Sequence, residues 1–283
     1  MSTPEVERNE AYFASRVDKT EADRLTVHAR LRDPHVRDGL RRIGIGAGQK
    51  AIDIGCGPLG ALLVLAEFVG PTGTVVGLDM DAPSLEQAGT ILRQHGHEGV
   101  RLVHANINTV PSSDVCPPGP FDVAVCSQFL NNQPDPVDTL RRIAGVVRPG
   151  GHLLVQSPLF FDGQPRSEPE VPAVNTVIRW FGELMQRRGA SPNVAREYHR
   201  LCQAAGLVEV SQRGFFLAEA SAAGTHLWAQ HDAAAGISAQ IIQHGMASRE
   251  EVDETRRQLK TAATWEFQVY FAAMHVELIA QVP

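Results

Sequence analysis

A glycine-rich segment, AIDIGCGPLG at residues 51–60, contains residue types that suit a nucleotide ligand. Gly55, Gly57 and Gly60 match the pattern GxGxxG, and Asp79 follows about 20 residues later, at the end of the next expected strand. Glycines let the backbone turn tightly beside a ligand, and an aspartate at that spacing accepts hydrogen bonds from ribose hydroxyls. Taken alone, this pattern is also that of a nicotinamide or flavin dinucleotide site.

Two polar residues favour a different nucleotide. Asp53 stands just before the first glycine, where a carboxylate is poorly placed beside an anionic pyrophosphate but suits an ammonium group. Asn106 is expected at the end of a later strand, where an adenine edge can be read. A cationic, phosphate-free adenosine ligand with an amino-acid tail is S-adenosylmethionine. This cofactor is therefore favoured, while a dinucleotide remains the alternative.

The composition is that of a globular protein with a slightly acidic balance. The chain has 283 residues, of which 43% are hydrophobic and 20% are charged, and its formal net charge is −6. A nucleic-acid binder needs a concentrated positive surface, so this charge excludes that class as the default function. The length allows one large domain with a substantial core.

The cysteines and the lengths of the apolar runs indicate the cellular compartment of the protein. Cys56, Cys116, Cys126 and Cys202 form no CxxC pair, which argues against a zinc site or a disulfide framework and for reduced thiols. The N-terminal segment is acidic and polar, unlike a signal peptide, and no apolar run approaches the roughly 20 residues that span a bilayer. We therefore expect a cytoplasmic protein without a membrane span or a bound metal.

From residue 50 the sequence alternates between strand and helix patterns. Short apolar runs predict strands at 50–55, 74–80, 100–107, 121–127 and 152–158. The segments between them predict helices at 61–70, 84–96 and 135–148. Strands that alternate with helices form right-handed crossovers, so the pattern indicates a mostly parallel sheet.

Further segments lie before and after this strand–helix alternation. Residues 21–32 and 35–43 predict two helices, because Pro34 interrupts the pattern between them. Residues 158–192 are rich in proline and contain one expected helix at 175–189. These segments exceed what a nucleotide-binding sheet needs, so we expect them to contribute to substrate selection.

The last third of the chain predicts one more helix–strand pair, at 193–206 and 207–216, and then an Ala- and His-rich segment. Ser248 and Glu251 have the spacing of a capping box, which predicts the start of a helix. Residues 267–282 predict a single closing strand.

Five motifs in this order resemble class I SAM-dependent methyltransferases, particularly small-molecule enzymes of the ubiquinone/menaquinone and secondary-metabolite type. The motifs are AIDIGCGPLG, VVGLDMD, VRLVHANI, FDVAVCSQFLNNQPDPV and LRRIAGVVRPGGHLLVQSP. The resemblance is strong over residues 48–157 and weaker over the N-terminal helices and residues 193–216. It implies an α/β, Rossmann-like doubly wound fold, with a mostly parallel seven-stranded sheet, an antiparallel closing strand and helical cap insertions.

The resemblance also implies one domain over residues 1–283. Within it, residues 1–45 would be an N-terminal helical lid, and residues 46–216 and 265–283 the Rossmann-like core. Residues 217–264 would be a helical cap insertion. The cofactor would be S-adenosyl-L-methionine, and the product S-adenosyl-L-homocysteine.

Carried over residue by residue, the resemblance implies a set of cofactor contacts. Asp53 would face the methionine ammonium group, while Gly55 and Gly57 let the backbone pass close to the cofactor. Asp79 would bind the ribose hydroxyls, and Met80 would pack on the adenine face.

The remaining contacts come from later strand ends and from the lid. Asn106 would contact the adenine amino group, with Ile107 as its apolar neighbour, although relatives more often carry aspartate at the position of Asn106. Ser127 and Gln128 would lie beside the methionine moiety. Arg24, as part of the lid, would cover the cofactor, with an exposed helix face as the alternative.

The sequence indicates less clearly which residues bind the methyl acceptor. Asn131 and Asn132 stand where relatives often carry histidine, so no base is evident there. His226, in the expected cap, is the candidate general base, with an exposed surface histidine as the alternative. Six apolar side chains line an acceptor pocket or form a helix packing face: Phe160, Phe161, Trp180, Phe181, Met185 and Trp228.

The expected function is methyl transfer to an oxygen, carbon or nitrogen atom of a small, apolar organic acceptor by in-line displacement. A NAD(P)-dependent oxidoreductase that uses the GxGxxG turn is the alternative enzyme. A methyltransferase-like binding protein without turnover is the alternative outside enzymes. The expected partner is a small-molecule substrate and not a nucleic acid, and a homodimer is compatible with the helical insertions.

Overall fold

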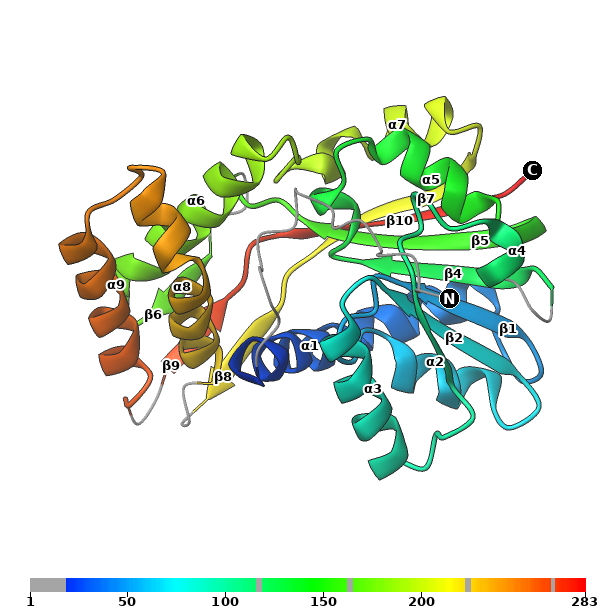
Figure 1. The fold of residues 1–283 in the computed structure, drawn as a ribbon, viewed down its shortest axis with the longest axis horizontal. Helices are drawn as coiled ribbons and strands as arrows, with labels where there is room; N and C mark the ends of the chain where they lie inside the picture. The colour runs from blue at the N-terminus through cyan, green and yellow to red at the C-terminus, as the bar shows by residue number, and fades with distance from the viewer. Residues whose placement is uncertain (1–18, 116–118, 162–164, 222–224, 266–267) are drawn as a thin grey trace, which may run out of the picture.

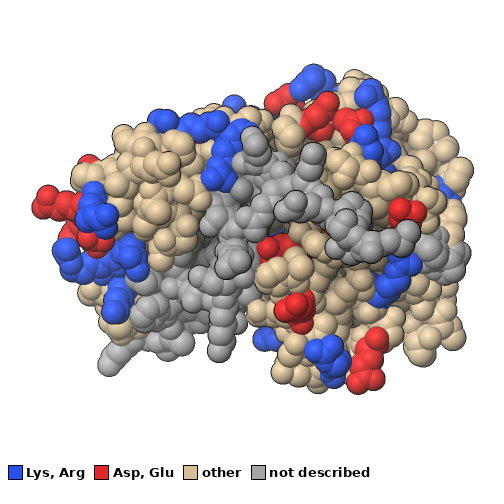
Figure 2. Space-filling view, in the orientation of Figure 1, with Lys and Arg blue, Asp and Glu red and all other residues tan. Residues whose placement is uncertain are grey.

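The computed structural model describes residues 19–115, 119–161, 165–221, 225–265 and 268–283. Side chains at 19–24, 27, 219–221, 225–233 and 268 lie outside this description. None of the helices in the described ranges is long and apolar enough to cross a membrane. On the described part of the face drawn in Figure 2, acidic and basic side chains are interspersed.

The main sheet has seven strands in the order β3-β2-β1-β4-β5-β10-β7. They are β1 (Lys50–Ile54), β2 (Thr74–Asp79), β3 (Arg101–His104), β4 (Phe121–Ser127), β5 (Val147–Pro158), β7 (Val208–Phe215) and β10 (His275–Gln281). The pairs among β1 to β5 are parallel, whereas β10 runs antiparallel to both β5 and β7. The predicted seven-stranded sheet with an antiparallel closing strand is confirmed.

Helices cover both faces of this sheet (Figure 1). One face carries α1 (Lys19–Ile43), α2 (Leu62–Val69) and α3 (Ala82–Gln94), and the other carries α4 (Ser112–Val115), α5 (Pro136–Ala144) and α7 (Tyr198–Ala204). Short 3₁₀ helices, η1 (Leu130–Asn132) and η2 (Val194–Glu197), follow β4 and precede α7.

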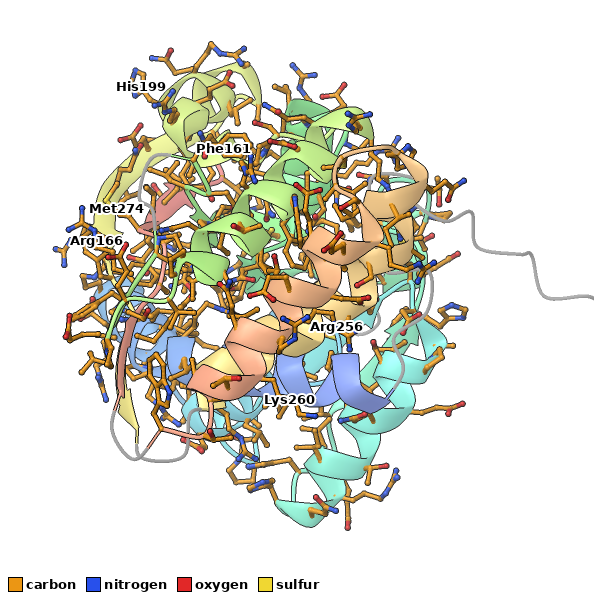
Figure 3. All side chains as sticks on the ribbon, turned by 90° about the vertical axis from the view of Figure 1, so that its left-hand side faces the viewer. Phe161, Arg166, His199, Arg256, Lys260 and Met274 are labelled. Carbon is orange, nitrogen blue, oxygen red and sulfur yellow. The ribbon has the colours of Figure 1, made fainter. Side chains whose placement is uncertain are left out.

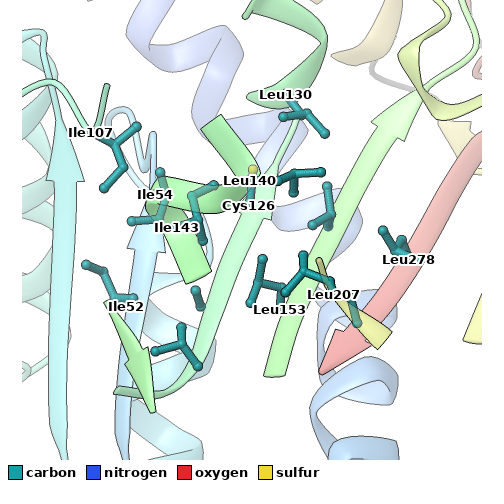
Figure 4. Close-up of a cluster of buried hydrophobic side chains, with 14 of the residues drawn as sticks. Ile52, Ile54, Ile107, Cys126, Leu130, Leu140, Ile143, Leu153, Leu207 and Leu278 are labelled. Atoms are coloured by element: carbon teal, nitrogen blue, oxygen red, sulfur yellow. The ribbon is translucent and has the colours of Figure 1, made fainter. Parts of the chain in front are cut away.

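Two hydrophobic cores lie on the two faces of the sheet, because successive side chains of a strand point to opposite sides. Ile52 and Ile54 of β1 pack with Leu140 and Ile143 of α5 (Figure 4). Ala51 of the same strand belongs to the other core, with α1, α2 and α3. The carboxyl ends of the strands are thereby held rigidly at one edge of the sheet.

A second layer lies beside the sheet, at the left of Figure 1. It contains a three-stranded antiparallel sheet, β6 (Arg166–Glu168), β9 (Gln268–Phe271) and β8 (Ala218–Ser221) in that order. Three helices accompany it, α6 (Pro172–Arg187), α8 (Thr225–Gln243) and α9 (Arg249–Ala262), and a separate hydrophobic core joins them. Figure 3 faces this layer, with Arg256 and Lys260 on α9.

The capping box predicted at Ser248 and Glu251 is confirmed. The Ser248 hydroxyl accepts the Glu251 N–H at 3.2 Å, and the Glu251 carboxylate accepts the Ser248 N–H at 2.7 Å. These reciprocal bonds satisfy two N–H groups that the first turn of α9 leaves without helical partners.

Two predictions about element boundaries are wrong. α1 is continuous through Pro34, because Ala29, Val36 and Leu40 are buried on its inner face and packing offsets the hydrogen bond that proline removes. The expected single strand at 267–282 is two strands, β9 and β10, which belong to different sheets. The break between them carries the chain from the second layer into the main sheet.

Candidate active site

A cavity of about 180 Å³ lies at the carboxyl ends of β1, β2 and β4. Ligands of open α/β sheets bind at this edge, outside the carboxyl ends of the strands. The cavity continues from the glycine turn past η1 to side chains of α6 and β9, and α1 contributes to its wall. It therefore joins the nucleotide-type motif to the second layer.

The glycine turn after β1 requires glycine for three different local reasons. Gly55, Gly57 and Gly60 have φ values of +71°, +54° and +53°, which disfavour any other residue. A Cβ atom on Gly60 would lie 2.2 Å from Asp53 Oδ2, and one on Gly55 would lie 2.3 Å from the Phe129 ring. A Cβ atom on Gly57 would meet no atom within 4 Å among the described residues, because that side of Gly57 opens into the cavity.

Asp53 lies behind this turn and is almost fully buried, at 1% exposure. Its Oδ2 accepts the Ala61 N–H at 2.6 Å, which ties β1 to the start of α2. Burial, with a smaller contribution from the charge of Asp79, raises the pKa of Asp53 to about 7, although the Ala61 hydrogen bond and the charge of Arg32 each lower it. Asp53 is not among the described residues that line the cavity, so its contact with a ligand ammonium group remains a prediction.

Asp79 ends β2 and lines the cavity. Its Oδ2 accepts the Gly57 N–H at 2.7 Å and its Oδ1 accepts the Asp81 N–H at 2.9 Å. Burial raises the pKa of Asp79, and these backbone hydrogen bonds partly lower it. A carboxylate has about four lone-pair sites, so the group retains capacity to accept from a ribose hydroxyl.

The structure brings most, but not all, of the predicted cofactor residues together. Gly55, Gly57, Asp79, Met80, Ser127 and Gln128 line the cavity. Asn106 and Ile107 are not among the lining residues that the structure describes.

Ile107 is 2% exposed within the core, and Asn106 Oδ1 accepts the Asn108 N–H at 3.0 Å. The backbones of Arg24 and His226 belong to α1 and α8, and both side chains lie outside the described residues. The roles predicted for these four residues remain predictions.

A histidine that sequence reasoning missed lies in the cavity wall. His275 is 4% exposed at the start of β10, and its Nδ1 lies 2.8 Å from the Ala273 carbonyl oxygen. Its Nε2 lies 3.1 Å from Gln128 Nε2, and Gln128 itself has a φ of +55°, which is uncommon outside glycine. The sequence signal that could have identified His275 is its position at the start of a mostly apolar run, which forms a buried strand.

Helix α1 is connected to the cavity by a chain of polar contacts. Arg32 Nε donates to Ser127 Oγ at 3.1 Å, and Ser127 Oγ lies 3.4 Å from Gln156 Oε1. Gln156 Nε2 donates to Glu277 at 3.0 Å, and Glu277 is paired with Arg42 of α1. These contacts fix α1 over the carboxyl ends of β4 and β5 and place the positive charge of Arg32 in the cavity wall.

The far side of the cavity is apolar. Phe160 and Phe181 line it, together with Ile178, Leu217 and Tyr270. These side chains come from α6, β9 and the ends of β5 and β7, which are far apart in the sequence.

The other four residues predicted for the acceptor pocket are not among the described residues that line the cavity. Trp180 and Met185 are buried in core clusters, and the Phe161 ring packs against Gly182. The side chain of Trp228 lies outside the described residues. Of the six predicted apolar candidates, Phe160 and Phe181 thus reach the cavity.

Comparison with known families agrees with this arrangement. A family model described as a methyltransferase domain matches residues 45–202, which is more than half of the chain. The chain belongs to this methyltransferase family. The matched region of the methyltransferase contains β1 to β5, the glycine turn and Asp79, and it ends before β7, β9 and β10. The family implies S-adenosylmethionine as the cofactor, as the motifs predicted.

Individual relatives resemble only part of this methyltransferase. The demethylmenaquinone methyltransferase of Anoxybacillus flavithermus is 33% identical over 118 residues, which cover 42% of this chain and 48% of the relative. The chain thus spans about half the length of the curated relatives that it matches first. The matches therefore identify the family and leave the acceptor open.

Solved structures share the fold. The YcgJ protein from Bacillus subtilis superposes with a TM-score of 0.55 at 17% identity, over 88% of this chain and 98% of that chain. A putative sarcosine dimethylglycine methyltransferase from Galdieria sulphuraria gives a TM-score of 0.53 at 15% identity, over 88% of this chain and 84% of that chain. Both likenesses extend over most of the chain, and they show the fold.

Proposed function

We propose that this methyltransferase transfers the methyl group of S-adenosylmethionine to a small, largely apolar organic acceptor. The observation that carries the proposal is the single cavity that joins the glycine turn and Asp79 to an apolar wall of Phe160 and Phe181. A cofactor and an acceptor that share one cavity can meet without solvent between them. This is what a direct displacement needs.

The residues at the glycine turn fit a cationic cofactor. Burial disfavours ionisation of both Asp53 and Asp79, and the charge of Asp79 further disfavours ionisation of Asp53. A ligand that carries positive charge relieves this repulsion, whereas an anionic pyrophosphate increases it. The open side of Gly57 gives the ligand access to the backbone, and Asp79 accepts hydrogen bonds from its ribose.

When bound, S-adenosylmethionine supplies an activated methyl group on a sulfonium sulfur. The chain then has to hold the acceptor in line and exclude water, because the donor is already reactive. Arg32, Ser127 and Gln128 form a fixed wall between α1 and the end of β4. Phe160, Phe181 and other apolar side chains form the opposite wall and favour an acceptor with a large apolar surface.

Apart from the glycine turn and Asp79, which suit either ligand, the strand order and the buried carboxylates do not favour a dinucleotide oxidoreductase. The dinucleotide fold continues its strand order as 3-2-1-4-5-6, whereas here the last strand, β10, is inserted antiparallel between β5 and β7. The buried carboxylate pair argues against a pyrophosphate for the reason given above. The assay described next distinguishes an enzyme from a methyltransferase-like protein that binds the cofactor without transferring its methyl group.

The proposal is tested with S-adenosylmethionine that carries a labelled methyl group. The purified protein is incubated with phenols, quinones, amines and polyketides, and transfer of label into the organic phase is measured. Wild type is expected to label at least one acceptor class, and Asp79→Ala is expected to label none. Binding of S-adenosylhomocysteine without transfer to any acceptor would instead indicate a binding protein.

A further inference from the structure

Three consecutive amide side chains at η1 line the cavity, and two of them form hydrogen bonds within the protein. Asn132 Nδ2 donates to the Gln128 carbonyl oxygen at 3.0 Å, and Gln133 Nε2 donates to the Phe129 carbonyl oxygen at 3.2 Å. Gln133 Oε1 also accepts from Asn108 Nδ2 at 2.8 Å. These bonds tie η1 to the segment that leaves β4, so its backbone is fixed at the cavity wall.

The third amide, that of Asn131, has an oxygen without a donor. Asn131 is 3% exposed, and its Oδ1 has no hydrogen-bond partner among the described residues. A buried acceptor without a donor is unfavourable. The terminal torsion of asparagine is broad, so Oδ1 can turn toward a donor in the cavity at little cost. We therefore expect a bound ligand to supply that donor.

The position of η1 relates this amide to both ends of the cavity. The Phe129 ring, just before η1, packs against Gly55 of the glycine turn. On its other side η1 contacts η2, whose N-cap residue Asn193 accepts the Phe161 N–H with its Oδ1 at 3.1 Å. Phe161 follows Phe160 of the apolar wall. The amide on η1 is thus placed between the cofactor end of the cavity and its apolar end.

We propose that Asn131 Oδ1 accepts a hydrogen bond from a hydroxyl or amino group of the methyl acceptor. The proposal rests on the methyl-transfer function proposed above, and it narrows the acceptor to largely apolar compounds that carry an O–H or N–H group. An amide oxygen accepts a hydrogen bond without taking the proton. Asn131 therefore selects and orients the acceptor and does not act as a general base.

The cofactor carries a donor of its own, the ammonium group of its amino-acid tail. A charged donor prefers a carboxylate to a neutral amide oxygen, because a charge-assisted hydrogen bond is about twice as strong. Asp53 lies beneath the glycine turn and is the group expected to attract the ammonium. The donor to Asn131 is therefore assigned to the acceptor, and the experiment measures the two ligands separately.

The test uses Asn131→Leu, which replaces the amide oxygen and nitrogen by methyl groups on the same branched carbon. Asn175→Leu is the matched control. Asn175 Oδ1, on α6, is also buried without a described partner, and Asn175 is not among the described residues that line the cavity.

The first measurement is denaturant unfolding without ligand. Both variants should unfold at a higher denaturant concentration than wild type, because each removes a buried acceptor that has no donor. A lower midpoint for Asn131→Leu would mean that its amide is used inside the protein, and would overturn the proposal.

The second measurement compares 2-naphthol with 2-methoxynaphthalene, in which a methyl group caps the hydroxyl. Affinities are measured by calorimetry with S-adenosylhomocysteine present, at pH 7, where a phenolic hydroxyl keeps its proton. The preference for the naphthol over its ether should be about fivefold greater in wild type and Asn175→Leu than in Asn131→Leu, which corresponds to one hydrogen bond of about 1 kcal/mol. S-adenosylhomocysteine itself should bind all three proteins equally.

The proposal is overturned if wild type binds neither probe or if Asn131→Leu keeps the preference of wild type. A loss of S-adenosylhomocysteine affinity in Asn131→Leu also overturns it, since the donor would then belong to the cofactor. A wild type that binds the ether as tightly as the naphthol overturns it even if Asn131→Leu does not fold. If wild type does not bind S-adenosylhomocysteine, the proposed function fails, and the probe comparison without that ligand still tests the Asn131 contact.

Discussion

Replacing Asp53 with asparagine removes one buried negative charge beneath the glycine turn and keeps the shape of the side chain. The amide oxygen of asparagine can still accept the Ala61 N–H that Asp53 Oδ2 accepts at 2.6 Å. The fold of the turn should therefore survive. What changes is the charge that we expect to attract the ammonium group of the cofactor.

The magnitude follows from the raised pKa of Asp53, which is about 7. At pH 6 about one tenth of the molecules carry an ionised Asp53, and at pH 8 about nine tenths do. If the ionised form binds the ligand, the affinity for S-adenosylhomocysteine should rise about tenfold between pH 6 and pH 8, or by about 1.4 kcal/mol. Binding should release a proton below pH 7, because the ligand favours the ionised carboxylate.

Calorimetry across this pH range, in two buffers of different ionisation enthalpy, measures both the affinity and the proton release. Asp53→Asn should bind more weakly, and the tenfold change should disappear. Asp33→Asn is the matched control, because burial raises the pKa of Asp33 to about 6 on α1, and Asp33 is not among the described residues that line the cavity. A flat affinity in wild type, or an unchanged pH dependence in Asp53→Asn, would refute the reasoning.

Two further predictions concern stability. Gly60→Ala, at a φ of +53° and with a new Cβ 2.2 Å from Asp53 Oδ2, should lower the free energy of unfolding by about 1–3 kcal/mol and weaken S-adenosylhomocysteine binding; denaturant titration and calorimetry measure the two effects, and an unchanged midpoint would contradict the turn geometry. Ser248→Ala should cost about 1 kcal/mol through loss of the helix cap and leave ligand binding unchanged. Thermal unfolding with and without ligand checks it, and a loss of binding would mean that α9 acts on the site.

The parts of the site that are local in sequence were the parts that sequence reasoning could predict. The glycine turn and Asp79 follow buried strands at a spacing that the cofactor imposes, so residue types and positions agree. The strand–helix alternation from β1 to β5 is equally local. Six of the predicted cofactor residues consequently line one cavity.

The acceptor side could not be predicted because distant segments build it. His275 enters the cavity only because β10 pairs between β5 and β7, and Tyr270 enters because β9 joins a second sheet. In the sequence, β9 and β10 lie in one mostly apolar segment, so the break between the two strands could not be recognised. Pro34 gave a misleading helix boundary, since packing of α1 on the sheet outweighs a local preference.

The central claim is that the cavity at the glycine turn binds S-adenosylmethionine and its product. Calorimetric titration of wild type and Asp79→Ala with S-adenosylhomocysteine, and separately with NADH, tests it most directly. We predict binding of S-adenosylhomocysteine by wild type, its loss in Asp79→Ala, and no heat from NADH in either protein. Absence of S-adenosylhomocysteine binding, or binding that Asp79→Ala leaves unchanged, would contradict the account.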